Sequence, residues 1–361
     1  MATSIVDAQS VLVIDLGLVN TRALLFDVVD KEYHFVAVGS ASTTLEAPFR
    51  DVREGIHQSI LKLQEITGRI LAGEDTQLII PTRSDGDGVD RLALVFSAGA
   101  ELHIITAGLL NEVSMESLNR LAGAAYGKVV ESLGLNDRRK LETQLDAILR
   151  SGPDLILVAG GSEGGASRSV AKQIELVNLA CRILPTDRRP EVLYVGNQAL
   201  AVRIKDTLEK FTPITTAPNI RPSIDVEDIN PAMGALSQVL ARLRSRKMGG
   251  LDTYLSALST PALPVAAGMG HIVRFLSNIY APKPVLALDI GASWTTLASA
   301  QNGELATHVS PYGMGSGIQS LLQHTKVEEV AQWLPIHIPI QVVRDYLWHK
   351  MLYPASIPMN I

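Results

Sequence analysis

The sequence predicts an α/β protein built from two related lobes with a parallel α/β block inserted between them. Three observations predict this class. A strand–Asp–x–Gly–strand pattern occurs twice, around Asp15 and around Asp289. Between the two copies, residues 113–215 alternate helical patterns with all-apolar strands, which is typical of parallel α/β structure. The 361 residues, 47% hydrophobic and 19% charged, suffice for two compact domains.

Both copies of the repeated pattern predict a β-hairpin. The first reads Val11-Leu-Val-Ile-Asp15-Leu-Gly17, and the second reads Val285-Leu-Ala-Leu-Asp289-Ile-Gly291. Each is a short apolar run, an Asp and a Gly, followed by hydroxylated and then apolar residues, which indicates a buried strand, a tight turn and a returning strand. The separation of the copies is too long for a solenoid repeat, so we expect one hairpin to open each lobe.

The remaining elements follow from periodicity and from Gly or Pro punctuation. In the first lobe we expect a third strand over 33–39, a helix within 51–68, a short strand over 77–80, a loop over 81–89, and strands over 92–96 and 103–106. In the inserted block we expect strands over 127–130, 155–158, 192–195 and 214–216, with helices over 114–125, 138–150, 167–184 and 198–210. A helix over 230–244, looser segments over 247–250 and 260–270, a Gly-rich loop over 312–317, a helix over 327–334 and a Pro-broken end complete the chain.

The hairpins carry groups suited to phosphate chemistry. Gly17 and Gly291 allow main-chain N–H groups to approach an anion closely. Asp15 and Asp289 can hold a hydrated Mg²⁺ or orient an attacking water. Hydroxyl donors follow at Thr21, Ser293, Thr295 and Thr296. A strand–Asp–Gly turn is also ordinary hairpin punctuation, but two copies with matching spacing favour a cleft that holds a nucleoside triphosphate from both sides.

With these residues in view, the chain resembles a known superfamily. The paired Asp-x-Gly hairpins look like the phosphate-1 and phosphate-2 motifs of the actin/Hsp70/sugar-kinase ATPases. Further motifs narrow the resemblance to the glutamate mutase accessory (L-component) proteins, from about residue 11 to the end. These motifs are Ser97-Ala-Gly99 with the run to Gly108, Pro153-Asp154 with the run to Gly165, Val195-Gly196-Asn197, and His349-Lys350 with Pro354 and Pro358.

The resemblance implies actin-like (ribonuclease H-like) ATPase lobes with an inserted α/β subdomain. It also implies ATP and Mg²⁺ as cofactors, Asp15 and Asp289 as catalytic and metal-holding groups, and lobe closure that reactivates an adenosylcobalamin-dependent mutase. The nucleotide-binding set that it implies is Gly17, Asn20, Thr21, Arg22, Gly291, Ala292, Ser293, Thr295, Thr296, Gly313 and Gly315.

The domain division expected from these patterns has four parts. Residues 9–110 form the first lobe, 111–220 the inserted subdomain and 221–280 a helical connection. Residues 281–361 start the second lobe, and the sequence leaves open whether that lobe is truncated.

The chain departs from the family pattern at the hairpins. Leu18-Val-Asn20 replaces a small hydroxylated stretch, and Thr21-Arg22 stands where the family has Thr-Lys. Arg neutralises phosphate with a less compact charge than Lys. Thr296 stands where the second hairpin usually ends in Asp, and no Gly-rich adenosine motif follows before Ile361. These departures leave open a degenerate nucleotide site.

The run Gly160-Gly-Ser162-Glu-Gly164 allows two interpretations. It satisfies the G-x-S-x-G pattern of a hydrolase nucleophile, and Asp225 and His271 follow in the matching order. Nothing around His271 prepares it as a base, so a motif without its context carries little weight. The run more simply opens a helix, either as an anion site or as a tight strand-to-helix connection.

Composition and scattered residues exclude several other classes. The net charge of −5 argues against nucleic acid or an anionic membrane as partner. The single Cys181 excludes an internal disulfide, and no zinc or EF-hand pattern is present among the histidines or around Asp85 and Asp87. The basic cluster Arg242–Lys247 reads as a solvated helix end or a phosphate contact. Without a signal peptide or an apolar span in the sequence, we expect a cytoplasmic location.

Three function classes follow. The first is an ATP-binding accessory or reactivating protein for a cobalamin-dependent mutase, with ATP hydrolysis left open and homo-oligomers compatible with the sequence. The second is a nucleotide-free, actin-like scaffold that presents a surface to a partner. The third is a small-molecule kinase of the same superfamily, for which no substrate pocket can be identified. ATP turnover separates the first from the second, and phosphate transfer to an added acceptor would support the third.

Overall fold

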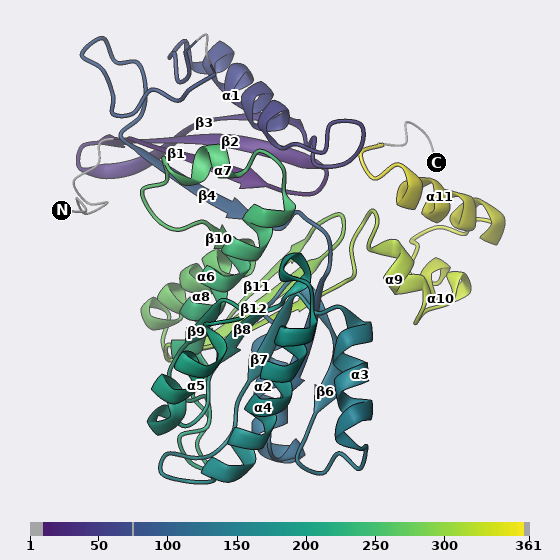
Figure 1. The fold of residues 1–361 in the computed structure, drawn as a ribbon. Coiled ribbons are helices and arrows are strands. Elements are labelled where there is room, and N and C mark those ends of the chain that lie inside the picture. Colours follow the sequence, from purple (N-terminus) through teal and green to yellow (C-terminus); the bar gives the residue numbers. More distant parts are fainter. Residues whose placement is uncertain (1–9, 74–75, 357–361) are drawn as a thin grey trace.

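The computed structural model describes residues 10–73 and 76–356, which contain three β-sheets (Figure 1). The first sheet has the strand order β10-β4-β1-β2-β3. Its strands are β1 (Ser10–Leu16), β2 (Asn20–Val29), β3 (Glu32–Ser42), β4 (Arg91–Phe96) and β10 (Leu263–Pro264). Strands β1 to β3 form an antiparallel meander, while β4 pairs parallel with β1 and β10 pairs parallel with β4.

Helix α1 (Arg53–Thr67) covers one face of the first sheet. It buries Ile56, Ile60 and Leu63 at helical spacing, as its apolar periodicity predicts. The helix lies so close to the sheet that a Cβ at Gly39 of β3 would come within 2.6 Å of the Leu63 main-chain nitrogen. Gly39 is therefore required by the close approach of helix and sheet.

The second sheet is entirely parallel, with the order β6-β5-β7-β8-β9. Its strands are β5 (Leu102–Ala107), β6 (Gly127–Leu133), β7 (Leu155–Val158), β8 (Glu191–Tyr194) and β9 (Ile214–Thr216). The all-buried residues of β7 and β8 explain their apolar sequences, because helices cover both faces of the sheet.

The covering helices divide between the two faces of the second sheet. A π-helical turn (Asn111–Met115) leads into α2 (Glu116–Ala122), and short 3₁₀ turns occupy Thr186–Arg188 and Gln198–Leu200. The remaining helices of this block are α3 (Leu141–Ser151), α4 (Ser167–Ile183) and α5 (Ala201–Leu208). Apolar residues of α3, α4 and α5 pack together on one face, whereas α2 and the later helix α6 share a core with the other face and with the first sheet.

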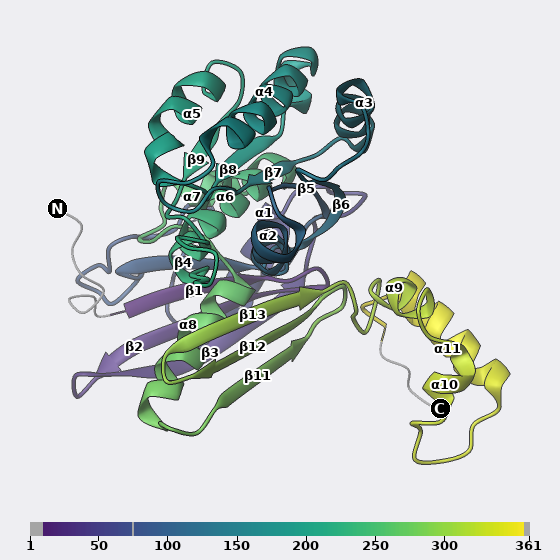
Figure 2. The ribbon, with the colours of Figure 1, turned by 90° about the horizontal axis from the view of Figure 1, so that it is seen from below.

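Three helices connect the second sheet to the third: α6 (Asn230–Lys247), α7 (Asp252–Leu255) and α8 (Val265–Ile279). The third sheet is a three-stranded antiparallel meander of β11 (Val285–Ile290), β12 (Thr295–Gln301) and β13 (Glu304–Ser310). Helix α8 contacts all three of its strands and also β4 and β10, so it lies between the first and third sheets (Figure 2).

The C-terminal helices α9 (Ile318–Leu322), α10 (Val327–Ala331) and α11 (Ile340–Leu352) project to one side (Figures 1 and 2). They have a small core of their own around Ile318, Val343 and Leu347. The expectation of a Pro-broken end was wrong for α11. Pro339 caps its start and Pro354 follows its end, so these prolines bound the helix instead of interrupting it.

Three further expectations need correction. Residues 77–80 form no strand but only an isolated bridge between Ala72 and Leu78. Residues 265–270, expected to be looser, belong to α8, where Gly270 allows a close approach to Leu305 of β13. Strand β5 pairs within the second sheet, so the change of sheet falls between Phe96 and Leu102. In each case long-range packing, which local patterns do not encode, decides the outcome.

The mixed α/β class and the inserted parallel sheet are confirmed. The four-part domain division stays a prediction. None of the helices in the described parts of the chain is long and apolar enough to cross a membrane.

Candidate functional site

The two predicted hairpins form with the same register. In the first hairpin, Asp15 of β1 lies opposite Arg22 of β2. In the second hairpin, Asp289 of β11 lies opposite Thr296 of β12. Each aspartate therefore occupies the same place relative to its turn, as the matching sequences predict.

The two turns also close with the same hydrogen bond. The Gly17 N–H donates to the Asn20 carbonyl at 3.1 Å, and the Gly291 N–H donates to the Trp294 carbonyl at 2.9 Å. A Cβ on Gly17 would lie 2.9 Å from the Asn20 carbonyl oxygen, and one on Gly291 would lie 3.2 Å from that of Trp294. A side chain at position 17 would therefore displace the Asn20 carbonyl, whereas at position 291 the Trp294 carbonyl would have to shift by only a few tenths of an ångström.

Residues of both turns line one cavity of about 440 Å³. Leu18 comes from the first turn, Ser293 and Trp294 come from the second, and the rest of the wall comes from four other segments. Those other lining residues are Leu45, Glu46, Gly99, Ala100, Glu101, Lys247, Pro311, Ser316, Gly317 and Ser320. The turns thus face one shared space, which we call the hairpin cleft.

The two aspartates are close enough to interact electrostatically. Burial is the main cause that raises the pKa of the Asp15 carboxyl, and the negative charge of Asp289 raises it further. The Arg22 guanidinium, whose Nη1 lies 3.1 Å from Asp15 Oδ2, acts in the opposite direction. The Arg22 charge does not fully offset these effects, because the pKa of Asp15 remains raised. A divalent cation would stabilise two carboxylates that repel each other in this way.

The hydroxyl groups expected to meet phosphate are mostly used within the protein. Thr21 is fully buried and its hydroxyl lies 2.9 Å from that of Thr43. Thr295 donates to the Tyr312 carbonyl at 2.8 Å, and Thr296 is buried with its Oγ1 3.3 Å from the Tyr126 hydroxyl. These threonines fix the hairpins, while the exposed Asn20 and Arg22 and the cleft-lining Ser293 remain accessible.

The Gly-rich loop is folded back onto the second turn. The Gly315 and Gly317 N–H groups donate to the Ala292 carbonyl at 2.8 and 3.0 Å. A Cβ on Gly313 would collide with the same carbonyl. The Ser293 and Ser316 hydroxyls lie 2.6 Å apart. This packing accounts for the glycines and places Ser316 and Gly317 at the edge of the hairpin cleft.

The structure places in the cleft one cation of the basic cluster Arg242–Lys247, which the sequence offered only as a group, either as a solvated helix end or as a phosphate contact. Lys247, the last residue of α6, lines the cleft, and its Nζ lies 2.5 Å from Asp154 Oδ1. The available signal was the basic cluster that ends α6, whose charges also stabilise the helix C-terminus. Glu46 and Glu101 complete the charged lining.

Tyr126 connects the inserted block to the second hairpin. It is 1% exposed, its hydroxyl accepts a hydrogen bond from the Ala266 N–H at 2.9 Å, and its ring meets that of Trp294 edge-on with centroids 5.8 Å apart. Burial raises the pKa of Tyr126 to about 12. The phenol therefore stays neutral, and its contacts hold Trp294 and Thr296 of the second hairpin in place.

Arg244 holds the turn that precedes β5. Its side chain is buried, its Nη2 donates to the Tyr126 carbonyl at 2.9 Å, and its Nη1 donates to the Ala100 carbonyl. Gly99, at φ +107°, leaves room for this guanidinium, because a Cβ there would lie 2.5 Å from Nη1. Burial lowers the pKa of Arg244 to about 10. The side chain thus fixes one wall of the cleft.

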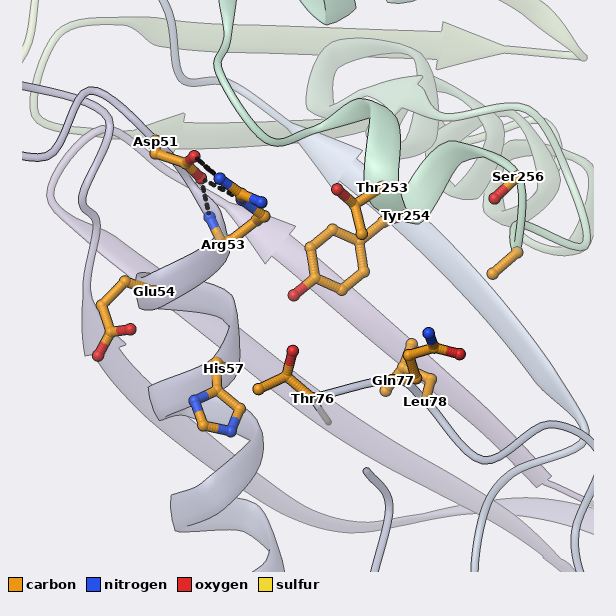
Figure 3. A pocket seen from close by; sticks show the side chains of 11 residues that line it. Asp51, Arg53, Glu54, His57, Thr76, Gln77, Leu78, Thr253, Tyr254 and Ser256 are labelled. Carbon is orange, nitrogen blue, oxygen red and sulfur yellow. Dashed lines mark hydrogen bonds and ion pairs between the residues drawn. The ribbon is translucent and has the colours of Figure 1, made fainter. Parts of the chain in front are cut away.

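A larger cavity of about 670 Å³ lies beside α1 and α7 (Figure 3). Figure 3 shows Tyr254 lying between α1 and the 76–78 segment. Two charged residues that line this cavity pair with each other: Arg53 Nη2 lies 2.6 Å from Asp51 Oδ2. The Arg53 guanidinium holds the pKa of the Asp51 carboxyl below its usual range. Neither hairpin contributes to this cavity, so it is separate from the candidate site.

Asp15 and Asp289 belong to the two hairpins but not to the lining of the hairpin cleft, and they fit a hydrated Mg²⁺ better than a directly ligated metal. No group of three or more His, Cys, Asp or Glu side chains suitable for a metal ion occurs in residues 10–73 and 76–356. Two carboxylates close enough for the charge of one to raise the pKa of the other can instead hold the ion through water, as Mg²⁺ prefers. Bound Mg²⁺ would supply charge neutralisation at the phosphates.

The repeated meander, the parallel pairing of β4 with β1 in the first sheet and the cleft between two like hairpins define a mixed α/β protein with a duplicated hairpin. The chain belongs to the MutL protein family, the glutamate mutase L-component family that the sequence motifs resemble, because the family model matches residues 11–361. Protein MutL of Clostridium tetanomorphum is 22% identical over 302 residues, which is 81% of this chain and 58% of that protein. The chain therefore spans less than two thirds of that relative's length.

Solved structures give weaker similarities. An exopolyphosphatase from Cytophaga hutchinsonii is 12% identical, with 96% of this chain and 61% of that chain covered and a TM-score of 0.24. A glycerol dehydratase reactivase is 12% identical, with 92% and 76% covered and a TM-score of 0.31. These scores are too low to transfer the position of any residue.

Proposed function

We propose that this chain binds Mg·ATP in the hairpin cleft and acts as an accessory or reactivating protein for an adenosylcobalamin-dependent mutase. The observation that carries the nucleotide part is the pair of hairpins with identical register whose turns face one cavity. Membership of the MutL family and the resemblance to mutase accessory proteins support the partner.

The proposed roles follow from position. Asp15 and Asp289 hold hydrated Mg²⁺ and orient water, while the Gly17 and Gly291 turns bring main-chain N–H groups toward the phosphates. Ser293 and Lys247 offer a hydroxyl and a positive charge from the cleft wall. Lobe closure on the nucleotide would transmit the binding energy to the mutase.

The test of the nucleotide part is calorimetric titration of Mg·ATP and Mg·ADP into the full chain. We expect a dissociation constant in the range of about 1–100 μM, as for ordinary small-molecule sites. Asp289→Ala should weaken binding at least about tenfold, because the cation loses one of its two carboxylates.

The matched control is Asp146→Ala, which removes a 63%-exposed carboxylate on α3 whose partner is Arg150 at 3.7 Å. This variant should bind as the wild type does. Absence of heat at millimolar nucleotide, or equal binding by both variants, would contradict the proposed nucleotide site. Phosphate release with and without the mutase then tests hydrolysis.

A second candidate, a nucleotide-free scaffold, is favoured by the internal use of the expected phosphate-binding groups. The hydroxyls of Thr21, Thr295 and Thr296 already have partners within the protein. This candidate predicts that mutase capture by the immobilised chain is independent of nucleotide and unchanged in Asp289→Ala.

A further inference from the structure

The winding of the second sheet reverses at one place. After β5 the chain adds β6 on one side, then returns to the other side of β5 to add β7, β8 and β9. In open parallel sheets, the connections leave in opposite directions at such a reversal. A crevice opens there beyond the carboxyl ends of the two strands, and ligands bind in it.

A cavity of about 270 Å³ lies at this reversal, and we call it the switch cavity. Its lining comes from the segment after β5 (Leu109, Leu110), the π-helical turn (Val113, Ser114), the segment after β7 (Gly160, Gly161, Ser162, Ala166) and the 221–224 segment (Arg221, Ser223, Ile224). The cavity therefore involves the ends of both strands at which the winding reverses.

The switch cavity is separate from the hairpin cleft. Residues 99–101, just before β5, line the cleft, whereas Leu109, just after β5, lines the switch cavity. Six strand residues lie between, which at about 3.3 Å per residue amounts to about 20 Å.

The walls of the switch cavity are mainly apolar. Leu109, Leu110, Val113 and Ile224 supply aliphatic side chains. Gly160, at φ +152°, keeps the floor open, because a Cβ there would lie 2.8 Å from Leu109 Cγ. Apolar walls with a few fixed polar groups are typical of small-molecule sites.

One end of the switch cavity carries a positioned cation. The Arg221 side chain is only 16% exposed, its Nε donates to Ser117 Oγ at 2.7 Å, and its Nη2 lies 3.5 Å from Glu227 Oε1. Neither the Gly161 nor the Ser162 N–H donates a hydrogen bond within residues 10–73 and 76–356. A guanidinium and two main-chain donors on one cavity favour an anionic group.

We propose that the switch cavity binds a small molecule with an apolar body and one anionic group, phosphate or carboxylate, that meets Arg221 and the Gly161–Ser162 turn. At the roughly 30 Å³ that a water molecule takes in the liquid, the volume accommodates about nine non-hydrogen atoms. This site is independent of the proposed nucleotide site. Of the two interpretations of the Gly160–Gly165 run, an anion site or a tight strand-to-helix connection, the proposal adopts the anion site.

The test is calorimetric titration of three probes into the full chain. Phenyl phosphate has the apolar body and the anion, inorganic phosphate has only the anion, and benzyl alcohol has only the apolar body. We expect phenyl phosphate to bind with a dissociation constant of about 1 mM or tighter, and the two partial probes to bind at least about tenfold more weakly.

Two variants locate the binding. Val113→Trp fills the cavity and should weaken the binding of phenyl phosphate at least about tenfold. The control Val202→Trp, at a 73%-exposed position on α5, should leave that binding unchanged. Asp289→Ala, in the second hairpin, should leave phenyl phosphate binding unchanged. Arg221→Gln should reduce the affinity for phenyl phosphate to that for benzyl alcohol.

The proposal is overturned if phenyl phosphate fails to bind, if it binds no better than inorganic phosphate, or if Val113→Trp leaves it unaffected. If only Asp289→Ala abolishes binding, phenyl phosphate binds at the hairpins and not in the switch cavity, and the proposal is equally overturned. Because Arg221 also contacts Ser117 and Glu227, thermal unfolding checks that its variant folds; if it does not, the Val113→Trp comparison decides.

Discussion

The two hairpins share their backbone geometry and differ in what covers them. Aligned on the aspartates, Ile14 of β1 corresponds to Leu288 of β11. Ile14 is fully buried, whereas Leu288 is 58% exposed. The neighbouring positions behave alike: Leu12 and Leu16 are buried, while Leu286 and Ile290 are 67% and 50% exposed.

The difference arises from elements that only the first hairpin has around it. Strand β4 pairs with the outer edge of β1, and α1 packs on the face that carries Ile14. In the described part of the chain, β11 pairs only with β12, and α8 covers the opposite face of its sheet. Turn geometry is therefore set by the local sequence, and burial is set by the elements that pack against the hairpin.

Truncation of the two equivalent side chains should separate these contributions most strongly. We expect Ile14→Ala to lower the free energy of unfolding by about 2–5 kcal/mol, because it leaves a cavity in a closed core. Leu288→Ala should change it by less than about 0.5 kcal/mol, since an exposed side chain loses little on truncation. Urea denaturation of both variants measures the difference, and equal costs would show that β11 is covered in solution.

The close contact of α1 with the first sheet offers a second comparison. Gly39→Ala should cost about 1–3 kcal/mol, because the new methyl group collides with the Ser59 carbonyl of α1. His308 holds the equivalent place in the third sheet, opposite Leu297, and is exposed. His308→Ala should stay within about 0.5 kcal/mol in the same thermal or urea experiment. A similar loss in both variants would contradict the assigned role of α1.

The sequence was sufficient for features that depend on local geometry. The Asp-x-Gly repeat predicted both hairpins, and apolar runs such as Leu155–Val158 predicted the parallel block. It was insufficient where distant segments decide. Nothing local shows that Thr21 would bond Thr43 or that Gly315 would bond Ala292, and the pairing of β5 depends on strands that come later in the chain.

The candidate site shows the same limit. A motif names residues that can bind phosphate, but a hydroxyl serves a ligand only if no protein group takes it first. Lys247 reached the cleft because α6 ends there, which depends on the packing of the whole helix against the first sheet and the second sheet. The basic cluster that ends α6 was visible in the sequence, but its position at the cleft depends on packing, which a single sequence does not show.

A third comparison concerns Tyr126, whose hydroxyl links Ala266 of α8 to Thr296 on the covered face of the third sheet. Tyr126→Phe removes the hydroxyl that accepts from the Ala266 N–H and contacts Thr296, and leaves both buried groups without that partner. We expect a loss of about 1–2 kcal/mol. Tyr254→Phe is the matched control, because Tyr254 is buried at 6% exposure within α7 and lines the cavity to which neither hairpin contributes. If Tyr126→Phe also weakens the binding of Mg·ATP and Tyr254→Phe does not, the Tyr126 hydroxyl stabilises the cleft as well as the fold.

The smallest expected effect concerns the charge of Asp15, which sits in the covered hairpin. Burial raises the pKa of this carboxyl, so the folded state holds its proton more tightly than the unfolded state does. The stabilisation is complete below the ordinary value of 3.8 and is lost as the pH rises through the folded value. Asp15→Asn should remove this fall, so the variant gains stability relative to wild type as the pH rises.

Asp51 gives the control of opposite sign. Arg53 lowers the pKa of the Asp51 carboxyl, so its stabilisation is present above 3.8 and is lost as the pH falls. Asp51→Asn should therefore lose stability relative to wild type as the pH rises, while Asp15→Asn gains it. Urea midpoints of the three proteins between about pH 3 and pH 7 measure both differences. Differences of the same sign in both variants would mean that Asp15 is exposed to water in solution, and the first hairpin would then be less covered than its packing indicates.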